Sequence, residues 1–144
     1  MIFRECPEDF NPKFEIVSVF CEHDGKIVLL HRDKNKPQGN TWGVPTGKVD
    51  DGEDIREALS RELAEETGIS IGKEQFNYFT KVYVRYPDYD FVYHIFHIKL
   101  PQKHDVKTNG VEHKDSVWVK PEDALKMPLI QDLDACIKLF YGLN

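Results

Sequence analysis

The amino-acid sequence predicts an α+β fold, in which helices pack on a mixed β-sheet. Three observations support this class. An apolar hairpin pattern occupies residues 14–31, a helical apolar repeat occupies residues 55–67, and a second pair of alternating strands precedes a final helical segment. Strands and helices therefore alternate along one continuous chain, and we expect residues 1–144 to form a single domain.

The first predicted hairpin is short and apolar. Residues 14–21 are rich in β-branched and aromatic side chains, which favours a strand. The Asp-Gly pair at residues 24–25 favours a tight turn, so residues 27–31 are predicted to form the return strand. The polar residues 32–41 contain proline and glycine and are predicted to form a loop.

A helix is predicted for residues 55–67, after a short segment with turn residues at both ends. The apolar residues that recur every four positions in it are Ile55, Leu59 and Leu63. The acidic turn formed by residues 50–54 offers side chains that can cap the helix N-terminus. Gly68 directly follows the last turn, where glycine commonly ends a helix.

The second half of the chain predicts further strands and two helices. Residues 75–85 and 91–100 alternate in polarity around a turn, which indicates two neighbouring strands. Residues 116–120 predict a shorter strand. A short helix is predicted to open at Pro121, because proline suits the first helical turn. Residues 132–141 carry the apolar pattern of a final helix.

Composition and charge exclude some classes of function. The chain has a formal net charge of -6, and this acidic balance disfavours a long nucleic acid as a partner. No apolar run is long enough for a membrane span, so no membrane partner is expected. The first residues lack the pattern of a secretory signal. Cys6, Cys21 and Cys136 are too widely spaced for a metal clip or redox pair, and we expect a cytoplasmic location.

The predicted helix carries a cluster of carboxylates. Glu62 and Glu66 are four residues apart and share one helix face, which Glu65 borders. Like charges at this spacing repel one another by roughly a few tenths of a kcal/mol per pair, so a bound cation would stabilise the cluster. Mg²⁺ prefers oxygen ligands and commonly binds carboxylates together with water and substrate phosphates. Taken alone, these glutamates also fit an ordinary solvated acidic surface.

The spacing around this cluster resembles the Nudix box. The matching positions, in order, are Gly47, Glu53, Arg61, Glu62, Leu63, Glu65, Glu66, Gly68 and Ile69. Every defining position of the box is filled over residues 47–69, and a chance match at one starting position has a probability of roughly one in a billion. Residues 118–122 and the flanking strands resemble the family more loosely. The resemblance implies the Nudix α/β/α sandwich, with a mixed central β-sheet flanked by helices.

The resemblance also implies an activity. Family members cleave phosphorus-containing anhydrides with Mg²⁺, for which Mn²⁺ can substitute, and we expect cleavage of a nucleoside diphosphate linkage in a small nucleotide. The expected type is MutT-like, which splits a (d)NTP into a nucleoside monophosphate and pyrophosphate. A nucleotide-sugar hydrolase, a dinucleoside polyphosphate hydrolase and a nucleotide-binding regulator without turnover are the alternatives. The complete set of box glutamates argues against the regulator, and the family also suggests a homodimer.

The family's functional positions correspond to individual residues of this chain. The metal ligands implied are Thr46 (through its carbonyl), Glu62, Glu65, Glu66 and Glu112. The catalytic residues implied are Glu53, Arg61, Glu62, Glu66 and Glu112. Arg61 would pair with Glu53 and orient the carboxylates, and Glu57 could share it. One of Glu62, Glu66 and Glu112 would take a proton from the attacking water. Many members have glycine where this chain has Thr46, so its loop can differ locally.

Two residues outside the box are candidates for substrate binding. Tyr86 lies 17 residues after Ile69, a spacing that resembles dinucleoside polyphosphate hydrolases, and its ring can stack on a base. Asp132 lies where MutT-type enzymes can carry a side chain that recognises a base edge. As alternatives, Tyr86 belongs to the core and Asp132 is an ordinary helix N-cap.

Overall fold

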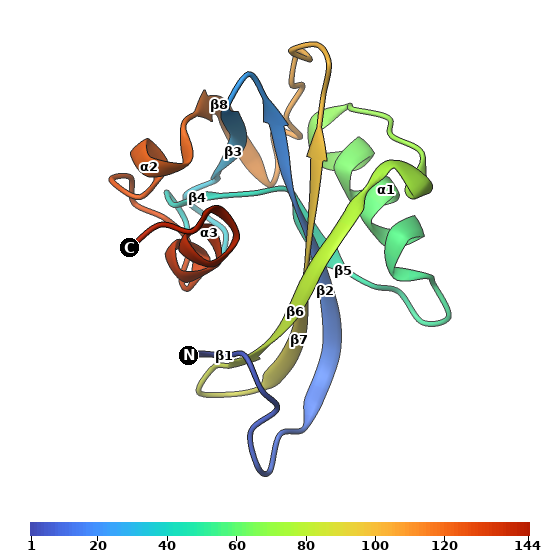
Figure 1. Ribbon diagram of the computed structural model, residues 1–144, viewed down its shortest axis with the longest axis vertical. Coiled ribbons are helices and arrows are strands. Elements are labelled where there is room, and N and C mark those ends of the chain that lie inside the picture. The colour runs from blue at the N-terminus through green and yellow to red at the C-terminus, as the bar shows by residue number, and fades with distance from the viewer.

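The computed structural model describes residues 1–144 as a sheet with helices on both faces (Figure 1). The strands are β1 (Ile2–Phe3), β2 (Pro12–His23), β3 (Lys26–Arg32), β4 (Trp42–Gly43), β5 (Thr46–Lys48), β6 (Asn77–Arg85), β7 (Asp90–Lys99) and β8 (His113–Val119). The helices are α1 (Ile55–Thr67), α2 (Pro121–Ala124) and α3 (Leu133–Tyr141), with a 3₁₀ turn η1 (Lys73–Gln75). The α+β class and the α/β/α arrangement are confirmed.

The sheet divides into two parts at β2. Its main path runs β1-β6-β7-β2-β3-β4, with β5 paired to β2 and β8 paired to β3. Strands β2 and β7 are parallel, and the other pairs are antiparallel. Beyond their turn, β2 and β3 pair only at Glu22–Ile27 and His23–Lys26. Nearer the start of β2, residues 16–18 pair with β5 instead. Strand β3 therefore diverges from β2, and the first residues of the Nudix-like segment 47–69 lie where the two strands separate.

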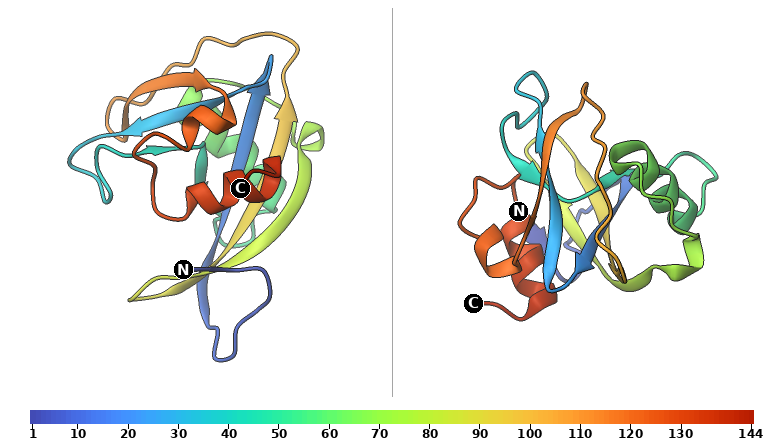
Figure 2. Two further views of the ribbon diagram at one scale, coloured as in Figure 1. Left: turned by 60° about the vertical axis from the view of Figure 1, so that its left-hand side comes forward. Right: turned by 90° about the horizontal axis from the view of Figure 1, so that it is seen from above.

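Each face of the sheet has its own hydrophobic core. Helix α1 lies on one side, and α2 and α3 lie on the other (Figure 2). On the α1 side, Leu59 and Leu63 are completely buried against Val17 and Val19 of β2. On the other side, Ile137 of α3 packs in the second core. The alternation of β2 side chains therefore supplies both cores from one strand. None of the helices combines the length and apolar character that crossing a bilayer requires.

Helix α1 begins and ends at capping residues. The side chain of Asp54 accepts hydrogen bonds from the backbone N–H groups of Arg56 and Glu57, at 3.1 and 3.4 Å. Gly68 adopts a φ of 76° and donates its N–H to the carbonyl of Ala64 at 2.9 Å. A glycine takes this left-handed conformation without steric cost. These caps determine where the helix begins and where it ends.

Several details differ from the sequence prediction, and the short strands β4 and β5 were not predicted. Strand β1 was not predicted, because two residues at a sheet edge carry no detectable periodicity. Residues 73–75 form a 3₁₀ turn, so β6 begins at Asn77. Strand β8 begins at His113, earlier than the predicted residue 116, because its pairing with β3 continues through a register shift.

Candidate active site

A cavity of about 530 Å³ lies at the opening of the sheet. Among the residues that line it are seven that the sequence singled out: Thr46, Gly47, Glu62, Glu66, Tyr86, Glu112 and Asp132. They come from β5, α1, the turn after β6, the segment before β8 and the start of α3. Except for Glu65, the predicted metal-binding and substrate-binding residues therefore surround one space, whose size suits a small nucleotide.

Glu66 is the most buried carboxylate of the cavity. It is 6% exposed, and its Oε1 accepts the backbone N–H of Thr46 at 2.9 Å. Burial raises the pKa of Glu66 well above its ordinary value, and the charges of Glu62 and Glu112 raise it further, although the Thr46 hydrogen bond acts in the opposite direction. A bound cation would offset both the desolvation and the repulsion.

Strand β5 turns the carbonyl of Thr46 away from β2. The carbonyl of the preceding residue, Pro45, accepts the N–H of Val19 at 3.2 Å, so Pro45 is bonded to β2. The N–H of Thr46 instead donates to Glu66 on α1. In an extended strand the N–H and C=O of one residue lie on the same edge, so the Thr46 carbonyl also faces away from β2. This orientation leaves the carbonyl free for the predicted role of metal ligand.

Gly47 leaves the space that the Glu62 carboxylate occupies. A Cβ added to Gly47 would lie 2.0 Å from the Cδ atom of Glu62, which is a severe overlap. The φ of Gly47 lies outside the left-handed region, so an alanine could adopt this backbone. Glycine is therefore required here for space, because any side chain would displace Glu62.

We expect Gly47→Ala to lower kcat by about a hundred-fold, the effect of moving a catalytic group by roughly 1 Å. The melting temperature should change little, since the backbone tolerates alanine. Gly72→Ala is the matched control, because its Cβ would meet nothing closer than 4.0 Å. Steady-state kinetics and thermal melts of both variants test this prediction, and an unchanged kcat for Gly47→Ala would contradict it.

Arg61 forms ion pairs with Glu53 and with the cavity residue Glu62. Its Nε and Nη2 donate to the two oxygens of Glu53 at 2.9 and 3.0 Å, and its Nη1 donates to Glu62 at 2.8 Å. The hydrogen bonds from Arg61 lower the pKa of Glu53 to about 2. The structure thus contains the predicted Arg61–Glu53 pair. Sharing of Arg61 by Glu57 was a wrong prediction, because Glu57 pairs with Lys73 of η1 at 3.0 Å.

Glu65 does not line the cavity. Its side chain is 57% exposed, and its carboxylate lies 3.5 Å from Nη1 of Arg61. Successive residues of a helix are rotated by about 100°, so Glu65 is turned toward solvent when Glu66 faces the sheet. The structure therefore places Glu65 beside the other box glutamates on the outer side of α1, and its role as a metal ligand stays a prediction.

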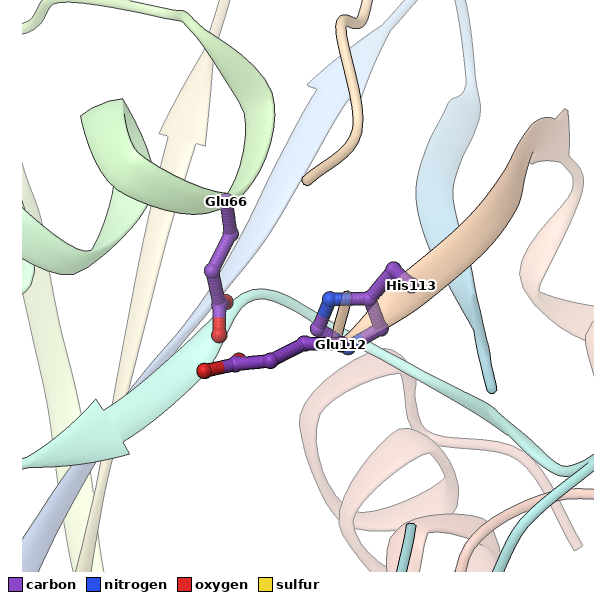
Figure 3. A group of neighbouring side chains, drawn as sticks. All are labelled: Glu66, Glu112 and His113. Atoms are coloured by element: carbon purple, nitrogen blue, oxygen red, sulfur yellow. The ribbon is translucent and has the colours of Figure 1, made fainter. Parts of the chain in front are cut away.

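Glu112 and His113 meet Glu66 at the cavity wall (Figure 3). The potential ligand atoms of the three side chains all lie within 4.8 Å of one another. The carbonyl of Glu112 accepts the N–H of Asp33 at 2.8 Å, which anchors this segment to the loop after β3. Burial lowers the pKa of His113, and the charge of Arg32 lowers it further. Two carboxylates and a neutral imidazole form a donor set that fits a divalent cation.

Comparison with known proteins identifies the family of this chain. The family model described as the NUDIX domain matches residues 12–140. The chain belongs to the Nudix family. It is a hydrolase that acts on phosphorus-containing anhydrides, a class of reaction that uses a divalent metal in this family. The carboxylate helix α1, with the flanking loops, is thus a Nudix box in both spacing and placement.

Individual relatives cover most of this Nudix hydrolase. The CTP pyrophosphohydrolase of Escherichia coli (strain K12) is 35% identical over 117 residues, which are 80% of this chain and 82% of that protein. The crystal structure of a MutT protein from Methanosarcina mazei Go1 has a TM-score of 0.79 at 26% identity and covers 92% of this chain and 95% of its own. The solution structure of the E. coli ORF135 protein has a TM-score of 0.72 at 30% identity, covering 90% and 89%.

Tyr86 and Asp132 lie at the cavity of this Nudix hydrolase together with Gln38. Burial raises the pKa of Tyr86, the nearby charge of Asp132 raises it further, and a hydrogen bond with Gln38 lowers it. Asp132 has a φ of 70° and makes no capping hydrogen bond with its side chain. Asp132 thus occupies the N-cap position of α3, as the alternative predicted, but its side chain does not cap the helix. Its Oδ2 lies 3.3 Å from the amino group of Met1.

The Nudix cavity also contains residues that the sequence pattern did not single out. Arg32, Lys36 and Lys48 line it, and such side chains suit the phosphate groups of a nucleotide. Arg32 and Lys36 belong to the segment 32–41, which was predicted only as a polar loop. His113 is one of six histidines in the sequence and was not predicted as a site residue. Two local features could have pointed to these residues: the basic side chains in segment 32–41, and the position of His113 directly after Glu112.

Proposed function

We propose that this Nudix hydrolase is a Mg²⁺-dependent pyrophosphohydrolase of nucleoside triphosphates, which releases a nucleoside monophosphate and pyrophosphate. The observation that carries the proposal is that carboxylates, cationic side chains and aromatic rings line the same cavity. The carboxylates suit a cation, Arg32 and Lys36 suit phosphates, and Tyr86 suits a base or sugar.

Five groups are proposed to hold the metal, all from the Nudix box or the segment before β8: the Thr46 carbonyl, Glu62, Glu65, Glu66 and Glu112. When bound, the cation neutralises phosphate oxygens and lowers the pKa of a water molecule. Arg61 keeps Glu62 in place through its hydrogen bond of 2.8 Å, while Glu53 accepts hydrogen bonds from its Nε and Nη2 atoms. One of Glu62, Glu66 and Glu112 accepts the proton of the attacking water.

Within this class, CTP and dCTP are the first substrates to test. The E. coli relative that is 35% identical carries the name CTP pyrophosphohydrolase. The Asp132 carboxylate can only accept hydrogen bonds when ionised, so it favours a base edge that presents an amino group, such as that of cytosine. A dinucleoside polyphosphate or nucleotide sugar is the second candidate, because Tyr86 lies within the same cavity and could stack on a second nucleoside.

A substrate panel tests the proposal. Ribo- and deoxyribonucleoside triphosphates, oxidised dNTPs, ADP-ribose, nucleotide sugars and dinucleoside polyphosphates should be compared by kcat/KM, with the phosphorus products resolved by ³¹P NMR. We expect the highest kcat/KM for CTP or dCTP, with pyrophosphate as the product. Release of orthophosphate alone, or a preference for dinucleoside polyphosphates, would contradict the proposed reaction, and no turnover on any compound would favour a binding regulator.

Asp132→Asn tests the base preference separately. Asparagine can donate as well as accept, so we expect the CTP:UTP ratio of kcat/KM to fall about ten-fold, equivalent to about 1.4 kcal/mol. Asp134→Asn, an exposed residue of α3, is the matched control and should leave the ratio unchanged. A ratio that is unchanged in Asp132→Asn would remove Asp132 from base recognition.

Two further parts of the prediction remain proposals. A cytoplasmic location is supported by the three cysteines, which are all free and thus suit a reducing compartment. A homodimer is supported only by the occurrence of dimers among other Nudix enzymes, and light scattering of the purified protein would test it.

A further inference from the structure

His113 carries a buried ring nitrogen that no protein group satisfies. The residue is 4% exposed, and its Nδ1 atom lacks a hydrogen-bond partner. Buried polar atoms in proteins are nearly always paired with a protein group, an ordered water or an ion. This nitrogen is therefore available to a bound species.

The unpartnered histidine faces the carboxylates of the Nudix site. Figure 3 shows a ring nitrogen of His113 turned toward the side chains of Glu66 and Glu112. The three candidate ligand atoms lie within 4.8 Å of one another, and the Nδ1 atom of His113 forms no hydrogen bond with either carboxylate. Ligands that share one cation, with bonds of about 2.1 Å, lie roughly 3 to 4 Å apart, so a small side-chain adjustment closes the site.

The backbone around His113 holds the ring in this place. His113 pairs with Arg32 across β8 and β3, and its backbone N–H donates to the carbonyl of Asn109 at 2.9 Å. The preceding residue, Glu112, is anchored through its carbonyl to Asp33. The two side chains are therefore delivered to the cavity together from one anchored segment.

We propose that His113 is a nitrogen ligand of the catalytic divalent cation, together with Glu66 and Glu112. The inference rests on the proposed metal site and adds a ligand outside the carboxylate set. Imidazole binds first-row transition-metal ions more readily than Mg²⁺, which prefers oxygen. The site is thus a mixed nitrogen and oxygen site that binds Mn²⁺ or Co²⁺ more tightly than Mg²⁺.

Electron spin-echo envelope modulation of bound Mn²⁺ tests this ligand without turnover. The full chain is loaded with one equivalent of Mn²⁺ in the absence of nucleotide, either unlabelled or with ¹⁵N-histidine. His113 is the only histidine that lines the cavity, so a histidine nitrogen coupled to the metal there identifies it. We expect ¹⁴N modulation in the unlabelled protein and its replacement by the ¹⁵N pattern in the labelled protein.

Two variants and a control extend the test. His113→Asn places an amide oxygen near the position of Nδ1, so we expect it to bind Mg²⁺ with little change but Mn²⁺ about ten-fold to a hundred-fold more weakly. His113→Gln serves as a second variant. His104→Asn, in the segment between β7 and β8, should keep both the modulation and the Mn²⁺ affinity.

The outcomes separate this inference from the proposed function. Mn²⁺ that binds with no histidine coupling in the ¹⁵N-histidine protein would overturn the His113 ligand, as would coupling that persists in either His113 variant. Such a result leaves triphosphate hydrolysis with Mg²⁺ intact. Failure of the substrate panel together with the expected histidine coupling would overturn the proposed substrate instead and keep His113 as a ligand.

Discussion

Glu66→Gln should reduce hydrolysis of the best triphosphate substrate by at least about a thousand-fold, within the range expected for loss of a group that acts directly on the reaction. Glutamine retains an oxygen that can accept the N–H of Thr46, the contact that Glu66 makes at 2.9 Å. The substitution therefore removes the negative charge at the most buried position of the carboxylate cluster and preserves the local hydrogen bond. Single-turnover and steady-state kinetics at saturating Mg²⁺ provide the measurement.

Glu57→Gln is the matched control for Glu66→Gln. Glu57 lies on the same helix but pairs with Lys73 rather than with the cavity residues, so its activity should equal that of the parent. The metal-free Glu66→Gln protein should also melt about 3 °C or more above the metal-free parent near neutral pH, because a carboxyl group that is costly to ionise when buried is replaced by a neutral amide. Equal turnover of Glu66→Gln and the parent would exclude Glu66 from the metal site.

Removal of divalent cations should abolish activity, and added Mg²⁺ should restore it. The charges of Glu62 and Glu112 raise the pKa of Glu66, and the charge of Arg32 lowers it by less than either of them raises it. The charges of Glu65 and Glu112 likewise raise the pKa of Glu62. Arg61 contacts Glu62 but is largely engaged by Glu53. Assays in excess chelator, followed by titration with Mg²⁺ and Mn²⁺, make the measurement, and activity that persists in chelator would require a different mechanism.

The stability of the metal-free protein should fall as the pH rises. Burial raises the pKa of Glu66 well above 4.5, so the folded protein keeps a proton that the unfolded chain releases. The stabilisation is complete below the unfolded pKa and is lost as the pH rises through the folded pKa. Thermal melts in chelator from about pH 5 to about pH 8 should show this decline, and Glu66→Gln should reduce it. Stabilisation by Mg²⁺ should correspondingly be larger at the higher pH.

Glu53 has the opposite dependence. Hydrogen bonds from Arg61 lower the pKa of Glu53 in the folded protein to about 2. The contribution of Glu53 to stability is therefore present above the unfolded pKa and is lost as the pH falls through the folded pKa. The two carboxylates thus titrate in separate windows, and Glu53 does not contribute to the decline above pH 5.

Local spacing was sufficient to predict helix α1 and the direction of its side chains. A helix places residues four apart on one face, so Leu59 and Leu63 predict the buried stripe, and Glu62 and Glu66 predict a carboxylate face. The caps at Asp54 and Gly68 follow from the same short-range chemistry. The structure agrees with these predictions because they depend on neighbouring residues alone.

The outward placement of Glu65 was not predictable in the same way. The spacing shows only that Glu65 borders the face shared by Glu62 and Glu66. Which of these three carboxylates points into the cavity depends on how α1 rotates against β2 and β5, and burial of the apolar stripe determines that rotation. The structure directs Glu66 inward to Thr46 and leaves Glu65 beside Arg61 near solvent.

The sequence by itself determined that segment 47–69 forms a Nudix box, with its glycines, ion pair and glutamates in defined order, because each relation spans a few residues. Only the tertiary structure decided what faces the box. Divergence of β3 from β2 opens the cavity, and the pairing of β8 with β3 brings His113 beside Glu66. These contacts join residues far apart in the chain, and they depend on strand register and core packing, which no local spacing specifies.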